Sequence, residues 1–157
     1  MNAYRTVLVG TDGSDSSMRA VARAGEIAAD ANAKLVVATA YFPRAERPGR
    51  GGLGGDHRAE DALKEGGYQM VGNARIYEIL HEARDRAKAA GAHDIEQKGI
   101  VGAPVDALMK LAKEIQADLL VVGNVGLSRV AGRFLGSVPA DVARRSKTDV
   151  LIVHTIP

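Results

Sequence analysis

The sequence predicts a single α/β domain in which five parallel strands form one sheet with helices on both faces. Short apolar runs rich in valine and leucine alternate with amphipathic stretches along the chain. Such alternation of strands and helices is typical of a parallel sheet with right-handed crossovers. The strands are also almost unbroken in their apolar character, which indicates burial on both faces. The length of 157 residues is that of one domain.

The chain begins with a predicted strand and helix. The run Thr6–Gly10 has the apolar character of a buried strand, and residues 15–30 place apolar side chains at helical spacing. Serine and aspartate at positions 14–16 precede this helix, where such side chains cap free backbone N–H groups. A second apolar strand is predicted over Lys34–Tyr41.

A segment rich in glycine and proline interrupts the alternation over residues 42–73. It holds Pro43, Pro48 and a run of glycines over 49–55, a composition typical of a mobile loop. Residues 56–68 could form a short helix. We expect a variable, solvated insertion at this place, and the alternative is a lid over a ligand.

The second half of the chain continues the alternation with three helices and three strands. Gly91 and Pro104 mark two boundaries, because glycine favours the C-terminal cap of a helix and proline its first turn. The helices are predicted over residues 76–90, 104–115 and 137–146, and the strands over Ile95–Val101, residues 119–122, and Val150 to His154.

The composition argues against several classes of function. The chain has no cysteine, so disulfides, thiolate catalysis and cysteine metal sites are excluded. A formal net charge of +2, no tryptophan and two phenylalanines do not favour nucleic-acid binding. No run approaches the roughly 20 apolar residues of a membrane span, and the first apolar run is too short for a signal peptide. We therefore expect a cytoplasmic protein that binds neither nucleic acid nor membrane.

A glycine-rich loop after the fourth strand has the outline of a phosphate-binding site. Gly123 and Gly126 follow the strand, and nine residues later Gly136 and Ser137 open the last helix. Glycine lets backbone N–H groups approach an anion closely, and a helix N-terminus adds free donors and a partial positive charge. The loop has neither the Gly-Lys-Ser/Thr ending of a P-loop nor the Gly-x-Gly-x-x-Gly fingerprint of dinucleotide-binding folds.

Three segments are expected to meet beyond the carboxyl ends of the strands, where ligands bind in an open parallel sheet. They are the turn of residues 10–14, the end of the second strand at Ala40, and the glycine loop. Asp12 could bond a ribose hydroxyl or stand behind a metal ion, or it could form an Asx turn before the first helix. No nucleophile, base and orienting group stand together, and the histidines lack metal-ligand spacing, so no catalytic or metal-binding residue is predicted.

The chain resembles the universal stress protein family over nearly its full length. The matching segments are residues 7–17, 102–126 and 135–154. Nucleotide-binding members of this family carry glycine, two residues, glycine, nine residues, and then Gly-Ser or Gly-Thr. The loop from Gly123 to Ser137 has this spacing without a gap.

The resemblance implies a Rossmann-like domain of the adenine nucleotide alpha hydrolase type over residues 1–157, with strand order 3-2-1-4-5. It also implies a homodimer that pairs through the strand from Val150 to His154, which would cover an exposed sheet edge. The implied contacts are Ala40 with adenine, Asp12 with ribose or metal, Val122 and Gly123 with base and sugar, and Gly126, Gly136, Ser137 and Val138 with phosphate. Gly10 and Thr11 join this set from the first turn, and Arg133 joins it from the loop, where it could also be a solvated side chain.

One departure from the family pattern favours a nucleotide with few charges. Many relatives have a polar or basic residue before the second glycine, where this chain has Val125, and charge-assisted contacts are the stronger phosphate contacts. We therefore expect a protein that binds an adenine nucleotide as a sensor, buffer or regulator in a stress response. Cyclic AMP is the specific candidate, AMP and ATP are competitors, and magnesium would accompany ATP only.

Two alternatives from other classes stay open at this point. The first is a slow magnesium-dependent ATPase or self-phosphorylating protein that uses Asp12. The second is a dimeric interaction module in which the nucleotide site is vestigial. A binding protein is favoured over an enzyme because the phosphate cradle is complete whereas a catalytic set is not.

Overall fold

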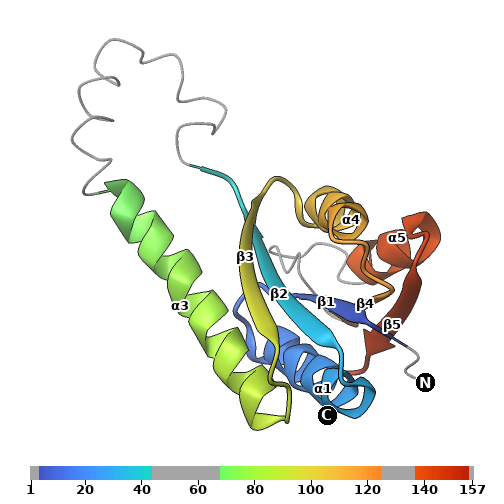
Figure 1. The fold of residues 1–157 in the computed structure, drawn as a ribbon. Coiled ribbons are helices and arrows are strands. Elements are labelled where there is room, and N and C mark those ends of the chain that lie inside the picture. The colour runs from blue at the N-terminus through green and yellow to red at the C-terminus, as the bar shows by residue number, and fades with distance from the viewer. Residues whose placement is uncertain (1–3, 44–67, 125–136, 156–157) are drawn as a thin grey trace.

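The chain forms a five-stranded parallel sheet in the order β3-β2-β1-β4-β5, with helices on both faces (Figure 1). A computed structural model describes residues 4–43, 68–124 and 137–155. The predicted fold class and strand order are confirmed. The strands are β1 (Thr6–Gly10), β2 (Lys34–Tyr41), β3 (Ile95–Val101), β4 (Leu119–Gly123) and β5 (Asp149–Val153), and the helices are α1 (Asp15–Ala31), α3 (Tyr68–Ala89), α4 (Pro104–Glu114) and α5 (Ser137–Arg145).

The start of α3 differs from the prediction. This helix begins at Tyr68, inside the segment predicted as an insertion, whereas the apolar pattern placed its start at Ile76. The intervening residues include Gly72 and Asn73, which are weak helix formers, so the sequence carries no start signal at Tyr68. Residues 44–67, which hold most of the predicted insertion and of its short helix, lie outside the described part of the chain.

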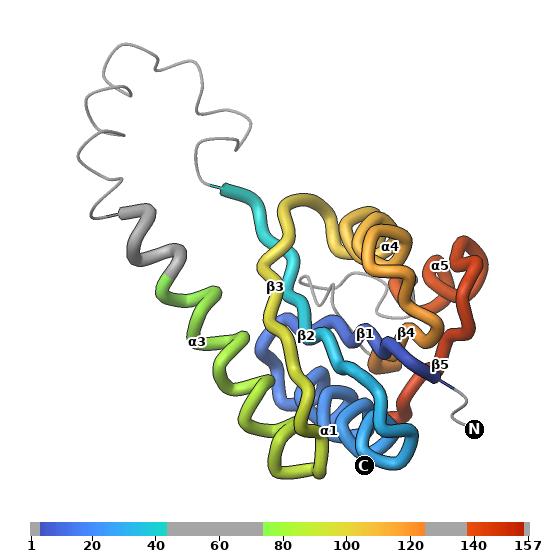
Figure 2. Tube along the Cα trace, viewed as in Figure 1, coloured from blue at the N-terminus to red at the C-terminus, as the bar shows by residue number. Residues whose placement is uncertain are grey.

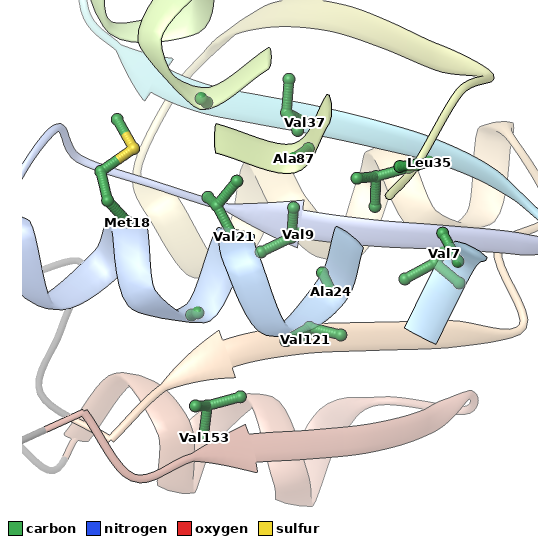
Figure 3. Close-up of a cluster of buried hydrophobic side chains, with 14 of the residues drawn as sticks. Val7, Val9, Met18, Val21, Ala24, Leu35, Val37, Ala87, Val121 and Val153 are labelled. Carbon is green, nitrogen blue, oxygen red and sulfur yellow. The ribbon is translucent and has the colours of Figure 1, made fainter. Parts of the chain in front are cut away.

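Alternate residues of the central strands face two separate hydrophobic cores. Val7 and Val9 of β1 pack with residues of α1 and α3, whereas Leu8 packs with residues of α4 and α5. Figure 3 shows the first core, in which Val21 of α1 and Ala87 of α3 lie over these strands. The period of two along each strand thus divides the interior into a layer on each face of the sheet.

The strand order reverses at β1, because β2 lies on one side of it and β4 on the other. Gly10, the last residue of β1, is paired with Ala38, whereas β2 continues to Tyr41. In a parallel sheet the crevice at such a switch point, beyond the carboxyl ends of the strands, is where ligands bind. The topology therefore places the candidate site at the end of β1.

Helices α1 and α3 approach each other closely at Gly25. A Cβ at this position would lie 2.8 Å from the carbonyl oxygen of Ala87 and 3.1 Å from the Cβ of Ala90. Figure 2 shows α3 running beside β3, with α1 next to its C-terminal half. The glycine therefore sets how near the two helices lie.

An ion-pair cluster joins β2 to β3 near their amino ends. The Nζ of Lys34 lies 2.7 Å from Oε1 of Glu96, and the Nζ of Lys98 lies 3.3 Å from Oε2. The hydrogen bond from Lys34 lowers the pKa of Glu96, although partial burial acts in the opposite direction. The same pair raises the pKa of Lys34.

We predict that Gly25→Ala destabilises the protein, although alanine is the better helix former. Helix propensity favours alanine by roughly 0.8–1.0 kcal/mol, whereas overpacking a core contact costs about 1–3 kcal/mol. The obstructing atoms include backbone, which cannot move aside cheaply, so the second effect should win. The free energy of unfolding in urea should fall for Gly25→Ala and change little for the exposed neighbour variant Glu26→Ala. An unchanged or higher value for Gly25→Ala would contradict the close approach.

We predict that Glu96→Gln makes the stability of the protein less sensitive to acid. Because the pKa of Glu96 is lower in the folded state, its contribution is present above the usual glutamate pKa of about 4.3. That contribution is lost as pH falls through the lowered value. Solvent screening keeps the effect small, so urea midpoints of both proteins are compared across the acid range. Glu114→Gln, at an exposed glutamate outside the cluster, is the control, and equal acid slopes for wild type and Glu96→Gln would refute the prediction.

Candidate functional site

Hydroxyl groups hold the turn between β1 and α1. Thr11 and Ser17 are buried, and their hydroxyl oxygens lie 2.7 Å apart. The N–H of Gly13 donates to Thr11 Oγ1 at 3.0 Å, and the N–H of Asp12 donates to Ser17 Oγ at 3.3 Å. Ser14 caps α1, because its side chain accepts a hydrogen bond from the N–H of Ser17 at 3.1 Å. The predicted helix cap is confirmed, and the chain's own hydroxyls fix the path of the turn.

Thr11 has a positioning role in this turn. Its hydroxyl is shared between Ser17 and Gly13, and its backbone N–H donates to the carbonyl oxygen of Ala38 at 2.9 Å. Both polar groups therefore serve the fold. A direct contact of Thr11 with a ligand stays a prediction.

The carboxylate of Asp12 forms the predicted Asx turn with one oxygen. Oδ1 accepts a hydrogen bond from the N–H of Ser14 at 2.9 Å. Within the residues that the structure describes, Oδ2 has no hydrogen-bond partner, and the side chain is half-buried. Oδ2 can therefore accept a hydrogen bond from a ligand while Oδ1 holds the turn. The two roles considered for Asp12 are compatible.

A small cleft opens at the carboxyl ends of β1 and β2, beside the start of α4. Its empty volume is about 240 Å³, counting the space that opens to solvent. Its lining combines apolar side chains with Thr11 and one carboxylate, a mixture typical of small-molecule sites. The described lining residues are Gly10, Thr11, Asp12, Ala38, Ala40, Pro104 and Leu108.

The remaining predicted site residues are placed differently. Val122 is 0% exposed and Val138 4% exposed, and both belong to the core under α4 and α5. Either could meet a ligand only through its backbone. Ser137 is the first residue of α5. Gly126, Arg133 and Gly136 lie outside the described residues.

Gly123 ends β4, and its missing side chain leaves room for Thr155. A Cβ at Gly123 would lie 3.3 Å from Cγ2 of Thr155 and 3.8 Å from the Cβ of Ala20 in α1. That side chain would thus point to the α1 face of the sheet, whereas the cleft is on the α4 face. Packing on the α1 face is thus one reason for a residue without a side chain here, and the contact of Gly123 with a ligand stays a prediction.

Asn124 and Thr155 were not among the predicted site residues. The backbone N–H and side-chain hydroxyl of Thr155 both donate to Oδ1 of Asn124, at 2.8 and 2.9 Å. The two residues are 31 positions apart in the chain, and no local pattern connects them. A polar residue directly after a buried strand at the switch point was the one signal that could have indicated Asn124.

The described residues hold neither a cluster of metal-binding side chains nor a helix that could span a membrane. In residues 4–43, 68–124 and 137–155, no three histidine or acidic side chains gather closely enough to hold a metal ion. None of the helices in these ranges combines the length and the apolar character that crossing a bilayer requires.

Comparisons with known proteins agree on one family. Residues 3–154 match the model of the universal stress protein family. The universal stress protein Rv1636 of Mycobacterium tuberculosis is 63% identical over 155 residues, which are 99% of each chain. A solved universal stress protein in complex with cAMP is 61% identical, with a TM-score of 0.72 over 99% of this chain and 100% of that one. A universal stress protein from Archaeoglobus fulgidus in complex with dAMP shares the fold, with 22% identity and a TM-score of 0.64 over 96% and 98% of the two chains.

We predict that Ser17→Ala lowers the free energy of unfolding by roughly 1–3 kcal/mol. The substitution leaves the buried hydroxyl of Thr11 and the N–H of Asp12 without their shared partner. Arg23→Ala, at an exposed position of the same helix, should change the value by less than about 0.5 kcal/mol. Urea unfolding measures both variants. Equal effects of the two substitutions would show that the hydroxyl pair does not hold the turn.

Proposed function

The chain belongs to the universal stress protein family, and from this premise we propose that it binds an adenine nucleotide at the carboxyl ends of β1, β2 and β4. It would act as a sensor, buffer or regulator in a stress response. The observation that carries the proposal is the cleft at the switch point, where Asp12 lines the same space as apolar residues of β2 and α4. The cAMP complex of a relative with 61% identity supports the same ligand class.

The end of β2 offers the base a backbone edge. The carbonyl of Ala38 accepts a hydrogen bond from Thr11 after β1, and the carbonyl of Tyr41 accepts one from Gly102 after β3. The backbone groups of successive residues in a strand point to opposite sides, so those of Ala40 point to the same side as those of Ala38, toward β1. Because β1 has already ended at Gly10, the N–H and C=O of Ala40 have no partner strand on that side. A donor and an acceptor at that place complement the N1 and N6 atoms of adenine. Apolar side chains of Pro104 and α4 would cover the ring.

The charges of the cleft favour cyclic AMP over ATP. Its described lining contains one carboxylate and no cation. A triphosphate brings several negative charges toward Asp12, whereas cyclic AMP brings a single diester charge. Val125, before the second glycine, also favours a ligand with few charges, because a valine side chain makes no charged contact with phosphate. The glycine loop and the start of α5 would hold the phosphate through backbone N–H groups.

We propose binding without appreciable turnover, with ATP and AMP as weaker ligands and magnesium bound only together with ATP. Release of ADP in the presence of magnesium should be the same for wild type and Asp12→Ala. A magnesium-dependent ADP release that disappears in Asp12→Ala would instead favour the slow ATPase.

A homodimer through β5 is part of the proposal. This edge strand is hydrogen-bonded to β4 on one side, and an open strand edge is a template for pairing with a second chain. Ile152 is 42% exposed on it, so pairing would also cover apolar surface. The pairing segment is the predicted stretch from Val150 to His154. A cytoplasmic location, without nucleic-acid or membrane partners, stays a prediction from the sequence.

Calorimetry with cyclic AMP, AMP and ATP tests the proposed function directly. We expect all three to bind and cyclic AMP to bind most tightly. The mass of any small molecule that co-purifies with the protein gives an independent answer. Absence of binding by all three nucleotides at about millimolar concentration, with no nucleotide co-purifying, would reject the proposal.

We predict that Asp12 and the ribose 2′-hydroxyl act as one pair. The 3′ oxygen of cyclic AMP is part of the cyclic phosphate, so only the 2′-hydroxyl can donate to Asp12. The variant Asp12→Ser keeps an oxygen for the N–H of Ser14 and loses the free Oδ2. Because a hydrogen bond to a charged group contributes about 1.5–3 kcal/mol, this variant should bind cyclic AMP roughly 10- to 150-fold more weakly.

The control for this pair is 2′-deoxy cyclic AMP. Wild type should bind it more weakly than cyclic AMP by a similar factor, and Asp12→Ser should bind the two ligands equally. Two independent losses that add in the double-mutant cycle would show that Asp12 does not contact the ribose.

A further inference from the structure

The residue that follows β5 by two positions is hydrogen-bonded both to the residue after β4 and to the first turns of α1. Thr155 is a buried polar residue, 3% exposed. Its N–H and hydroxyl donate to Oδ1 of Asn124, directly after β4. On the other side its hydroxyl contacts Oγ of Ser16, and its carbonyl oxygen accepts a hydrogen bond from Nη1 of Arg19 at 2.6 Å. Ser16 and Arg19 lie in the first turns of α1, which follows the Asp12 turn.

Asn124 directs its hydrogen bonds to three consecutive residues. Its backbone N–H donates to the carbonyl of Val153 at 2.8 Å, its Nδ2 donates to Nδ1 of His154 at 3.2 Å, and its Oδ1 accepts from Thr155. The orientation of the amide follows from the chemistry, because a backbone N–H can only donate. These bonds link the residue after β4 to the last residue of β5 and to the two residues that follow it.

The hydrogen-bond capacities of this network match. The hydroxyl of Thr155 donates to Asn124, so it accepts from the hydroxyl of Ser16. Thr155 is the buried member, and a buried polar group is costly unless it is paired; its N–H, hydroxyl and carbonyl oxygen all have partners. A satisfied polar network fixes one arrangement of its members, whereas apolar packing of the same volume tolerates several.

We propose that Asn124, Thr155, Ser16 and Arg19 form a clasp that positions the end of β4 against the β1–α1 turn and thereby sets the affinity for nucleotide. This inference rests on the proposed function, and it assigns positioning roles to residues that touch no ligand. Thr155 is the central member, because it bonds to Asn124 on one side and to Ser16 and Arg19 on the other. The clasp also links the site to β5, the edge strand proposed for dimer formation.

Two variants of the full chain open the clasp to different extents. Asn124→Ala removes the side-chain bonds to His154 and Thr155. Thr155→Val keeps the shape beside Gly123 and removes only the hydroxyl bonds to Asn124 and Ser16. Coupling between linked sites changes affinity by about 5- to 150-fold, so both variants should bind cyclic AMP more weakly within this range. Lys147→Ala, at an exposed residue outside both the clasp and the pairing segment, is the control and should bind as wild type does.

Hydrogen exchange of single amides separates the clasp from a general loss of stability, because a general loss would speed exchange in the core strand β2 as well. Linkage is reciprocal, so cyclic AMP should slow exchange of the Thr155 amide in wild type by more than it slows exchange in the core strand β2. Without ligand, both variants should speed exchange of the Asp12 and Asn124 amides and leave β2 unchanged. If Asn124→Ala does not fold, Thr155→Val and the wild-type exchange data decide the question.

Each outcome separates this inference from the proposed function. Weaker binding of cyclic AMP, together with faster exchange of the Asp12 and Asn124 amides, supports the clasp. Wild-type affinity in folded Thr155→Val, with unchanged exchange at Asp12 and Asn124, overturns it and leaves nucleotide binding standing. If wild type binds no nucleotide, the proposed function fails. In that case the exchange rates of Asp12 and Asn124 in the ligand-free variants still support the clasp when they rise and overturn it when they do not.

Discussion

Strand β1 lies at the centre of the sheet and ends at Gly10, whereas its neighbour β2 continues to Tyr41. This difference in length determines where a ligand can bind. The last residues of β2 have no partner on the β1 side, because the chain turns toward α1 after Gly10. The cleft opens between β2, this turn and the start of α4. Because β1 is buried on both faces, its end cannot shift without disturbing both hydrophobic cores.

The turn after β1 must be fixed for the same reason. Gly13 has a φ of +88°, a conformation that glycine adopts without strain, and the hydroxyls of Thr11 and Ser17 hold the backbone on either side of it. This arrangement fixes Asp12 in the lining of the cleft. The wall formed by β4 is held from outside by Asn124 and Thr155. Preorganised groups bind more tightly because less freedom is lost when the ligand arrives.

Local patterns predicted the strands and most helix boundaries, because burial on two faces leaves apolar runs that end in polar turns. The strand order came from the family resemblance, since no local pattern determines which strands are neighbours. The predicted start of α3, at Ile76, was wrong: the helix begins eight positions earlier, at Tyr68. Gly72 and Asn73 interrupt the helical pattern between these two positions. Gly123 was placed one position after the fourth strand, whereas it is the last residue of β4, and its contact with Thr155, far along the chain, has no signal in the sequence. The Asn124–Thr155 contact joins residues after two different strands, and only the folded sheet brings them together.

Chemical-shift mapping of the isotope-labelled protein with cyclic AMP tests the central claim most directly, because it reports which backbone amides sense the ligand. We expect the largest changes at Gly10, Asp12, Ala40 and Gly123, around the end of β1. Amides on the outer face of α3, near Tyr77 and Asp85, should stay unchanged. Changes centred on α3, or no saturable change at any amide, would contradict a nucleotide site at the end of β1.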